Sequence, residues 1–162
     1  MDPIRELEWL AFENDQQRHP TVPKYAIPQR RYEDKTANGL TRCIIDYLTL
    51  MGFHAERINV TGRIIDGRRT YTDVLGRLRT VGAVTWAKGS MQRGTADISA
   101  TVNGKSLKVE VKIGRDRQSE AQRRYQAQVE AAGGVYYIAK TFPGFYNWFN
   151  EMLKNNGTEE NN

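Results

Sequence analysis

Cysteine and histidine are scarce in this sequence, and their scarcity excludes several kinds of site. The 162 residues include one cysteine, Cys43, and two histidines, His19 and His54. A single cysteine forms neither an intramolecular disulfide nor a cysteine-based zinc site, and it fits a reducing compartment. Two scattered histidines are too few for a histidine-rich metal centre. A cysteine-based zinc site is therefore excluded, and a histidine-rich metal centre is not expected.

Long apolar runs and a leader segment are lacking as well. No run approaches the roughly 18 apolar residues that are needed to span a membrane, and Met1 to Glu6 lack the basic and apolar regions of a secretory signal. We therefore expect a protein of the cytoplasm (the host cytoplasm if it is viral) without a membrane partner. A chain of this length is expected to form one domain and to bury roughly two-thirds of its unfolded surface.

Positive charge is in excess, and it is concentrated in one segment. The formal net charge is +5 and the pI is about 9.4. Residues 62–93 alone account for this excess, because their acidic residues are outnumbered by arginines and lysines, among them Arg68, Arg69 and Arg93. The excess favours a polyanionic partner, and these three arginines are candidate nucleic-acid contacts. A solvated basic face is the alternative interpretation.

The N-terminal third predicts one main helix after a less regular arm. Residues 1–33 predict a short helix over 3–14 and an extended, proline-bearing arm, which packs either on this domain or on another subunit. The apolar stripe from Leu40 to Met51 predicts a helix over 36–51, with Asp34 or Thr36 as the N-cap. We assign residues 34–154 to the main domain.

The remaining elements predict a mixed sheet. Residues 54–60 predict a strand that enters the core, and 62–93 a basic, strand-rich insertion with a hairpin turn at Asp66-Gly67. Ser119 to Gln122 is a capping-box pattern that opens a helix, Val135–Ala139 is a buried strand, and a last helix covers about 143–154. Residues 155–162 are expected to be disordered. A helix between two strands implies parallel pairing, so the fold class is α/β with helices on both faces of the sheet.

One hairpin carries the most specific information. Asn103-Gly104 is a strong two-residue turn signal, and this turn places Val102 opposite Lys105. Counting outward, Asp97 faces Glu110, and both side chains project to one face of the sheet. Lys112 points the same way, because side chains alternate along a strand. Two carboxylates and one lysine are therefore expected to converge.

This convergence has two interpretations. Opposed carboxylates repel, and a divalent cation such as Mg²⁺ relieves the repulsion, with the carbonyl of Val111 as a further ligand. Lys112 would then orient a water or balance charge on a phosphoryl group, which favours phosphodiester hydrolysis. The alternative is the solvated side of an amphipathic sheet. The hairpin by itself does not choose between them.

The pattern resembles the PD-(D/E)XK nuclease superfamily, whose motif is an aspartate, a hairpin and then Glu-x-Lys. Here Asp97 is followed by Glu110-Val111-Lys112. Within that superfamily the chain is most similar to the virus-type VRR-NUC nucleases and the Holliday-junction resolvases, including phage-type proteins. The similarity covers about residues 34–142 and includes the stretches 94–98, 118–122 and 132–138. It implies a restriction-endonuclease-like αβββαβ core.

The resemblance also implies a function and a set of site residues. It predicts a DNA endonuclease that depends on Mg²⁺ or Mn²⁺ and acts on branched or flapped DNA in replication, recombination or repair. Asp97 and Glu110 would be metal ligands and Lys112 the catalytic lysine. Gln122 would lie near the active site, although it also fits the capping-box partner of Ser119. A homodimer is expected, because resolvase-like relatives cut two strands symmetrically. From their position after the Glu-x-Lys strand, Arg115 and Arg117 are further candidate phosphate contacts.

The chain departs from the family pattern at two points. Ala96 replaces the usual proline before the aspartate, and the first helix lacks the glutamate that usually joins the metal site. Asn38, Glu33 and Asp34 are the nearest candidates for that position. This absence favours an alternative function, a catalytically weak or inactive nuclease-fold protein that binds nucleic acid. A structural or assembly protein is a second alternative.

Overall fold

The computed structural model of the chain describes residues 2–58, 62–87 and 92–159. Its centre is a four-stranded mixed sheet in the order β1 (His54–Arg57), β6 (Ile98–Val102), β7 (Lys105–Val111) and β8 (Val135–Ala139). β1, β6 and β7 pair antiparallel, whereas β8 runs parallel to β7. The α/β class and the parallel pairing predicted from the sequence are confirmed.

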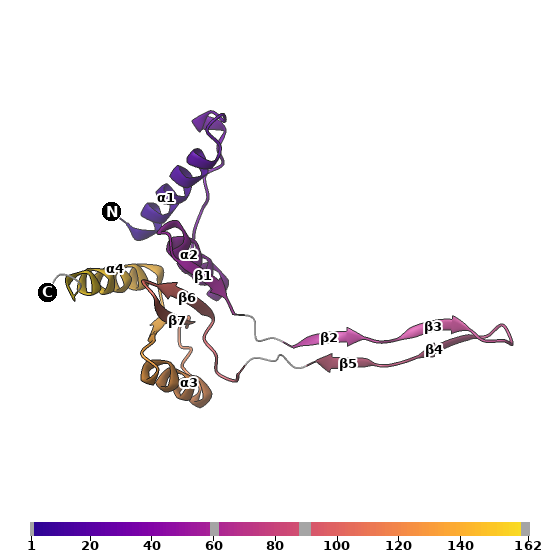
Figure 1. Ribbon diagram of the computed structural model, residues 1–162. Helices are drawn as coiled ribbons and strands as arrows, with labels where there is room; N and C mark the ends of the chain where they lie inside the picture. Colours follow the sequence, from indigo (N-terminus) through magenta and orange to yellow (C-terminus); the bar gives the residue numbers. More distant parts are fainter. Residues whose placement is uncertain (1, 59–61, 88–91, 160–162) are drawn as a thin grey trace.

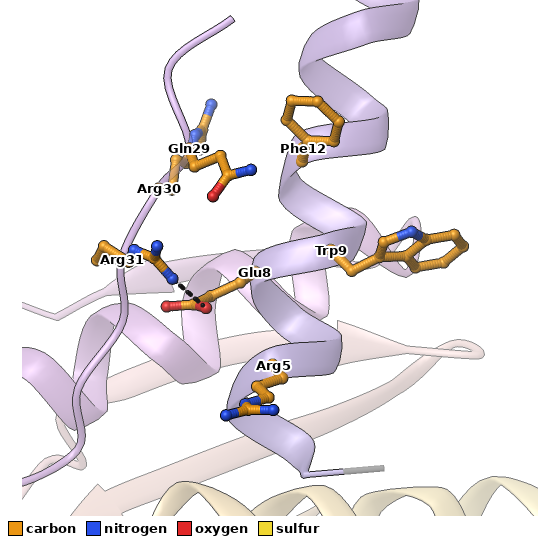
Figure 2. A pocket seen from close by; sticks show the side chains of 7 residues that line it. All are labelled: Arg5, Glu8, Trp9, Phe12, Gln29, Arg30 and Arg31. Atoms are coloured by element: carbon orange, nitrogen blue, oxygen red, sulfur yellow. Dashed lines mark hydrogen bonds and ion pairs between the residues drawn. The ribbon is translucent and has the colours of Figure 1, made fainter. Parts of the chain in front are cut away.

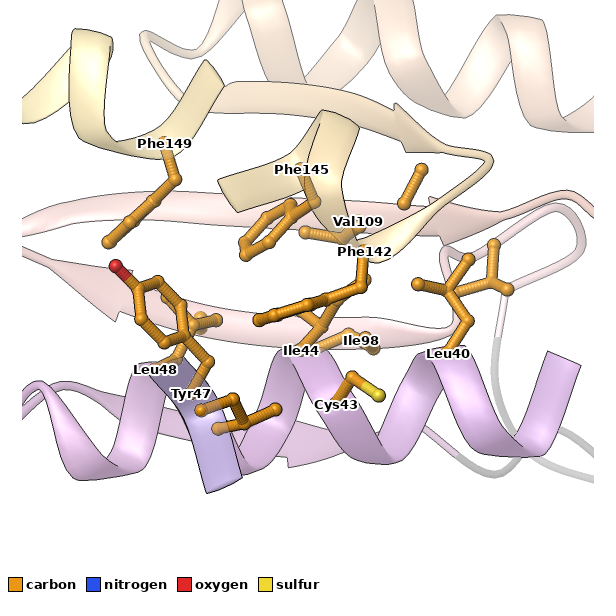
Figure 3. Packing of buried hydrophobic residues seen from close by; sticks show 14 of the residues in the cluster. Leu40, Cys43, Ile44, Tyr47, Leu48, Ile98, Val109, Phe142, Phe145 and Phe149 are labelled. Atoms are coloured by element: carbon orange, nitrogen blue, oxygen red, sulfur yellow. The ribbon is translucent and has the colours of Figure 1, made fainter. Parts of the chain in front are cut away.

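Helices pack against both faces of this sheet. The apolar stripe of α2 (Ala37–Leu50) and the aromatic side chains of α4 (Phe142–Glu159) meet Ile98 and Val109 in one buried cluster (Figure 3). α3 (Glu120–Ala131) contacts the opposite face, where Tyr125 packs edge-on against Tyr136 of β8. Thr36 is the N-cap of α2, since its hydroxyl accepts a hydrogen bond from the Gly39 N–H at 3.0 Å.

The N-terminal segment packs on its own domain. α1 (Pro3–Arg18) extends beyond the predicted end at residue 14, and its Leu7 and Ala11 are fully buried in the same core as α2. The following segment contains one short 3₁₀ helix, η1 (Lys24–Ala26), and is fastened back to α1 by an ion pair between Arg30 and Asp15 at 2.7 Å. The sequence had left open whether this segment packs on its own domain or on another subunit.

β1 differs from the sequence expectation. It was predicted to enter the core, but it is the edge strand of the sheet, and three of its four side chains are exposed. The reason is the strand order, because β6 and β7 take the central positions and leave β1 one neighbour. Residues 59–61 of the predicted strand lie outside the described residues.

Residues 63–87 form an antiparallel ribbon that projects from the sheet (Figure 1). β2 (Arg63–Asp66) pairs with β5 (Val84–Ala87), and β3 (Arg69–Thr72) pairs with β4 (Leu78–Val81). The predicted turn at Asp66-Gly67 is wrong, because the Gly67 N–H donates across the ribbon to the Ala83 carbonyl at 3.1 Å. The chain reverses at Asp73–Arg77 instead.

The C-terminal tail also differs from the expectation. α4 continues to Glu159, so residues 155–159 are helical rather than disordered. Residues 160–162 lie outside the described part of the chain. Within the described residues, no helix combines the length and apolar character needed to cross a membrane.

Candidate active site

The β6–β7 hairpin has the register that its turn residues predict. Asn103 and Gly104 both have positive φ, 48° and 76°, as a tight two-residue hairpin turn requires. Val102 pairs with Lys105, and Ile98 pairs with Val109. The register prediction is therefore confirmed, and it places Asp97 beside the last residues of β7.

Asp97 is held against the end of β7 by the backbone. Its Oδ2 atom accepts a hydrogen bond from the Val111 N–H at 2.8 Å. The Asp97 carboxylate is half-buried, and its negative charge acts on Glu110. The two carboxylates thus lie close enough to influence each other, as the hairpin register predicts.

Glu110 is a buried carboxylate with several hydrogen-bond donors around it. Only 2% of its surface is exposed. Its Oε1 atom accepts from the Lys112 ammonium at 3.1 Å and from the Gln122 amide, while the Tyr136 hydroxyl donates to Oε2 at 3.4 Å. Burial and the neighbouring Asp97 charge raise the pKa of Glu110, although Lys112 opposes the shift.

Lys112 joins two carboxylates. Its Nζ atom lies 3.1 Å from Glu110 Oε1 and 3.2 Å from Asp116 Oδ2, and its side chain is 9% exposed. Burial by itself lowers the pKa of Lys112, but Glu110 and Asp116 outweigh burial and raise the pKa above 10.5. The ammonium is therefore charged at neutral pH.

Gln122 performs both tasks that the sequence suggests for it. Its Oε1 atom accepts from the Ser119 N–H at 2.8 Å, which completes the capping box at the start of α3. Its Nε2 atom donates to Glu110 Oε1. One amide therefore fixes the N-terminus of α3 and the orientation of Glu110, and the two interpretations are compatible.

Gly94 brings the loop before Asp97 against α3. Its φ is +82°, and a Cβ at this position would lie 2.4 Å from the backbone carbonyl of Ala121. Only glycine tolerates both the positive φ and this close approach. The conformation of residues 94–97 is thus matched to the helix that carries Gln122.

Two contacts of the site were not predicted from the sequence. Tyr136 pairs with Lys108 across β7 and β8, so its hydroxyl reaches the face of Glu110. Strand alternation places Tyr136 and Tyr137 on opposite faces of the sheet, and the structure shows that Tyr136 is buried. Tyr137 stacks on Trp148, with ring centroids 4.0 Å apart. Asp116 lies in the loop after β7, and the periodicity of the sequence does not predict side-chain contacts in a loop.

The predicted phosphate-binding arginines are distributed over separate segments. Arg93, Arg115 and Arg117 are exposed in the loops that flank β6 and β7. Arg68 and Arg69 lie on the ribbon, and Arg68 pairs with Asp66 at 2.7 Å. The structure therefore does not bring the five arginines into one cluster.

The candidates for a third metal ligand have other surroundings. Asp34 Oδ2 accepts from the Phe142 N–H at 2.8 Å and so caps α4. Glu33 and Asn38 line a shallow surface groove of about 270 Å³ together with Arg31 and Arg42. Among the described residues, no group of three or more histidine, cysteine, aspartate or glutamate side chains is arranged to hold a metal ion.

A second groove lies between α1 and the returning segment 29–31 (Figure 2). Its volume is about 330 Å³, and Trp9, Phe12 and Arg5 are among the residues that line it. The Arg31 guanidinium pairs with Glu8 at 3.2 Å, and Arg30 pairs with Asp15. These ion pairs attach the segment to α1. We therefore interpret the groove as the space that remains where the N-terminal segment packs on this helix.

Comparison with family models and curated sequences provides no relative from which to transfer a function. No protein-family model matches the sequence, and no curated protein shows significant similarity to it. The function is therefore inferred from the residues and the fold of this chain.

Proposed function

We propose that this protein is a metal-dependent DNA endonuclease that hydrolyses phosphodiester bonds in branched or flapped DNA. The observation that carries the proposal is the cluster at the end of β7. There a buried glutamate, a charged lysine and an aspartate that directly precedes the adjoining strand β6 converge on one face of the sheet. A solvated sheet face does not account for this cluster, because Glu110 and Lys112 are buried.

The order of the elements supports the same proposal. α2, β1, β6, β7, α3 and β8 follow one another as helix, three antiparallel strands, helix and parallel strand. This order is the one expected for a restriction-endonuclease-like core, with the ribbon inserted between the first and second strands. We accordingly interpret the fold as that core.

The donor set fits a hard divalent cation. Asp97 and Glu110 supply carboxylate oxygens. Burial, followed by the charge of Asp97, raises the pKa of Glu110. Glu110 Oε1 is occupied by Lys112 and Gln122, whereas Oε2 has one long contact with Tyr136. Mg²⁺ or Mn²⁺ held by these carboxylates, with the Val111 carbonyl as a further predicted ligand, would stabilise negative charge on a scissile phosphate.

The side chains of this chain have distinct tasks in such a reaction. Gln122 and Tyr136 hold the Glu110 carboxylate in place, and the Val111 N–H holds Asp97. The Lys112 ammonium is fixed between two carboxylates and stays protonated, so it can stabilise charge on a phosphate oxygen and orient an attacking water. The exposed Arg115 and Arg117 are suited to hold the phosphate backbone near this cluster.

The test is cleavage of linear, flapped and four-way DNA in Mg²⁺, Mn²⁺ or EDTA. Asp97→Asn keeps an oxygen that can accept from the Val111 N–H but removes the charge, and Lys112→Met removes the ammonium. We expect each variant to lower the cleavage rate about a hundredfold or more. Lys105→Met, on the exposed end of the same strand, is the matched control and should cleave like the unmodified protein.

Two outcomes would contradict this proposal in different ways. Cleavage that persists in Asp97→Asn would show that the reacting site lies elsewhere. Salt-sensitive DNA binding without cleavage would support the alternative function, an inactive nuclease-fold protein that binds nucleic acid. One structural observation favours this alternative: Asp34 caps α4, and among the described residues no group of three such side chains is arranged to hold a metal ion. Sedimentation with and without four-way DNA would test the homodimer.

A further inference from the structure

The tip of the ribbon presents apolar side chains to solvent. Val74 and Leu75 are the first two residues of the loop between Asp73 and Arg77, and they are 102% and 70% exposed. Turn positions of this kind ordinarily carry Gly, Pro, Asn, Asp or Ser. Exposed apolar side chains in such a position indicate contact with a partner.

The one acidic side chain of the tip, that of Asp73, is directed inward and forms hydrogen bonds within the loop. Asp73 Oδ1 accepts from the N–H groups of Leu75 and Arg77, each at 2.9 Å, and Asp73 Oδ2 accepts from Arg79 at 3.0 Å. The Gly76 N–H donates to the Asp73 carbonyl, and Gly76 has a φ of +74°. This is a three-residue hairpin loop with glycine at the left-handed position. Its carboxylate is shielded, at 16% exposure, while the apolar pair points outward.

The charge of the ribbon indicates what kind of partner it binds. Residues 63–87 contain five arginines and two aspartates, and both aspartates are already paired, with Arg68 and with Arg79. Among the described residues, Arg69 and Arg77 have no ion pair, and both are exposed. The ribbon also exposes apolar side chains away from the tip, among them Leu78 at 78% and Trp86 at 65%. A surface that combines exposed arginines with exposed apolar side chains suits a polyanion that also offers an apolar interior, and the base stack of DNA combines these two properties.

The dimensions of the ribbon fit duplex DNA as well. An antiparallel strand rises about 3.4 Å per residue, so Arg63 to Leu75 span roughly 40 Å. A two-stranded ribbon fits the major groove, which is about 12 Å wide. The opposed Tyr71 and Arg79, with Arg69 on the same strand face, give this ribbon groups that contact phosphates and bases.

We propose that the ribbon lies along duplex DNA and that Val74 and Leu75 insert into the base stack as a wedge. Unstacking a base step costs free energy, and the cost is smallest where the stack is already interrupted. The tip therefore favours DNA at a flap or branch. This inference deepens the proposed function, because it assigns recognition of the branched substrate to an element separate from the carboxylate cluster.

The test uses a flapped duplex with 2-aminopurine at the branch point, in EDTA so that cleavage chemistry does not enter. Binding of the unmodified protein should raise the 2-aminopurine fluorescence. The double variant V74S/L75S should lose this rise and bind about tenfold more weakly, with an unchanged salt dependence. The variant R69Q/R77Q should keep the rise but reduce the slope of log K against log[salt] by about 2. Val22→Ser, at an exposed valine outside the ribbon, is the matched apolar control and should behave like the unmodified protein.

Two results would overturn the proposal. An undiminished fluorescence rise in V74S/L75S would show that the tip does not enter the stack. The second result has two parts. The unmodified protein would cause no rise in 2-aminopurine fluorescence, and V74S/L75S would weaken self-association measured by sedimentation. The tip would then be an interface between copies of this chain. Neither result depends on whether the carboxylate cluster cleaves DNA, so failure of the tip and failure of the nuclease site are distinguishable.

Discussion

At the residue scale, the buried side chains of Glu110, Lys112 and Cys43 differ in the partners that surround them. Glu110 and Lys112 are as buried as many core residues, yet each has hydrogen-bonding partners that keep it oriented. Cys43 is also buried, but its neighbours are the apolar residues of the core. Its Sγ donates only to the Glu33 carbonyl, at 3.4 Å.

Cys43 is therefore expected to be chemically inert in the folded protein. Burial, followed by the nearby Asp34 and Asp46 charges, raises the pKa of the thiol from 9.0 to about 12. Because a raised pKa favours the protonated thiol, about a thousandfold less thiolate is present at pH 8 than for a thiol of ordinary pKa. Ellman's reagent should react slowly in native buffer and fast in guanidinium chloride. Fast reaction in native buffer would show that Cys43 is accessible.

The raised pKa of Cys43 also makes the stability of the folded protein depend on pH in the alkaline range. A group whose pKa is higher in the folded state contributes stability below its unfolded pKa, and this contribution is lost as the pH rises toward the folded pKa. For Cys43 that interval lies between pH 9 and about 12. At neutral pH the contribution is complete.

At the element scale, the junction between the 92–97 loop and α3 aligns two parts of the candidate site. Asp97 comes from one side of this junction and Gln122 from the other, and Gly94 sets how closely they approach. The sequence did not predict this contact, because Gly94 and Ala121 meet only when α3 packs back on the sheet.

A pair of glycine variants tests this junction. Gly133 has nearly the same φ as Gly94, +80° against +82°, but a Cβ at Gly133 would meet open space. Gly133→Ala should therefore lower the free energy of unfolding by about 1 kcal/mol, from the positive φ alone. Gly94→Ala should lower it by about 1–3 kcal/mol more, because the Ala121 backbone must move. Urea denaturation measures both, and equal losses would show that the close approach at Gly94 is unimportant.

The hairpin and the ribbon show why some turns were predictable and others were not. Asn103-Gly104 is flanked by alternating apolar residues, so its turn and its register follow from local sequence. Asp66-Gly67 has the same kind of dipeptide, but strand pairing with residues 83–87 continues past it. The true reversal depends on the Asp73 carboxylate, which binds two backbone N–H groups.

At the scale of the whole molecule, the N-terminal segment completes the core. α1 packs beside α2 and α4, and its Leu7 and Ala11 contribute to the cluster that supports the sheet. The sequence showed an amphipathic helix but not its docking site, because the docking surface is assembled from helices far apart in the chain.

Truncation of Leu7 is expected to destabilise the whole domain. Leu7→Ala removes a fully buried side chain and should lower the free energy of unfolding by about 2–5 kcal/mol. Trp9 is on the same helix but 53% exposed, so Trp9→Ala, the matched control, should lower it by much less than Leu7→Ala. Denaturation should remain one cooperative transition. A separate early transition would mean that α1 unfolds independently of the sheet.

Local patterns in the sequence determined the α/β class, the hairpin register and the residues that meet at the end of β7. These features follow from turn chemistry and strand alternation, which act over a few residues. Only the tertiary structure decided that β1 is an edge strand, that Tyr136 rather than Tyr137 faces Glu110, and that Asp34 caps α4. These outcomes depend on how distant segments pack, because burial and pairing assign each side chain its partner only after the sheet and its helices have assembled.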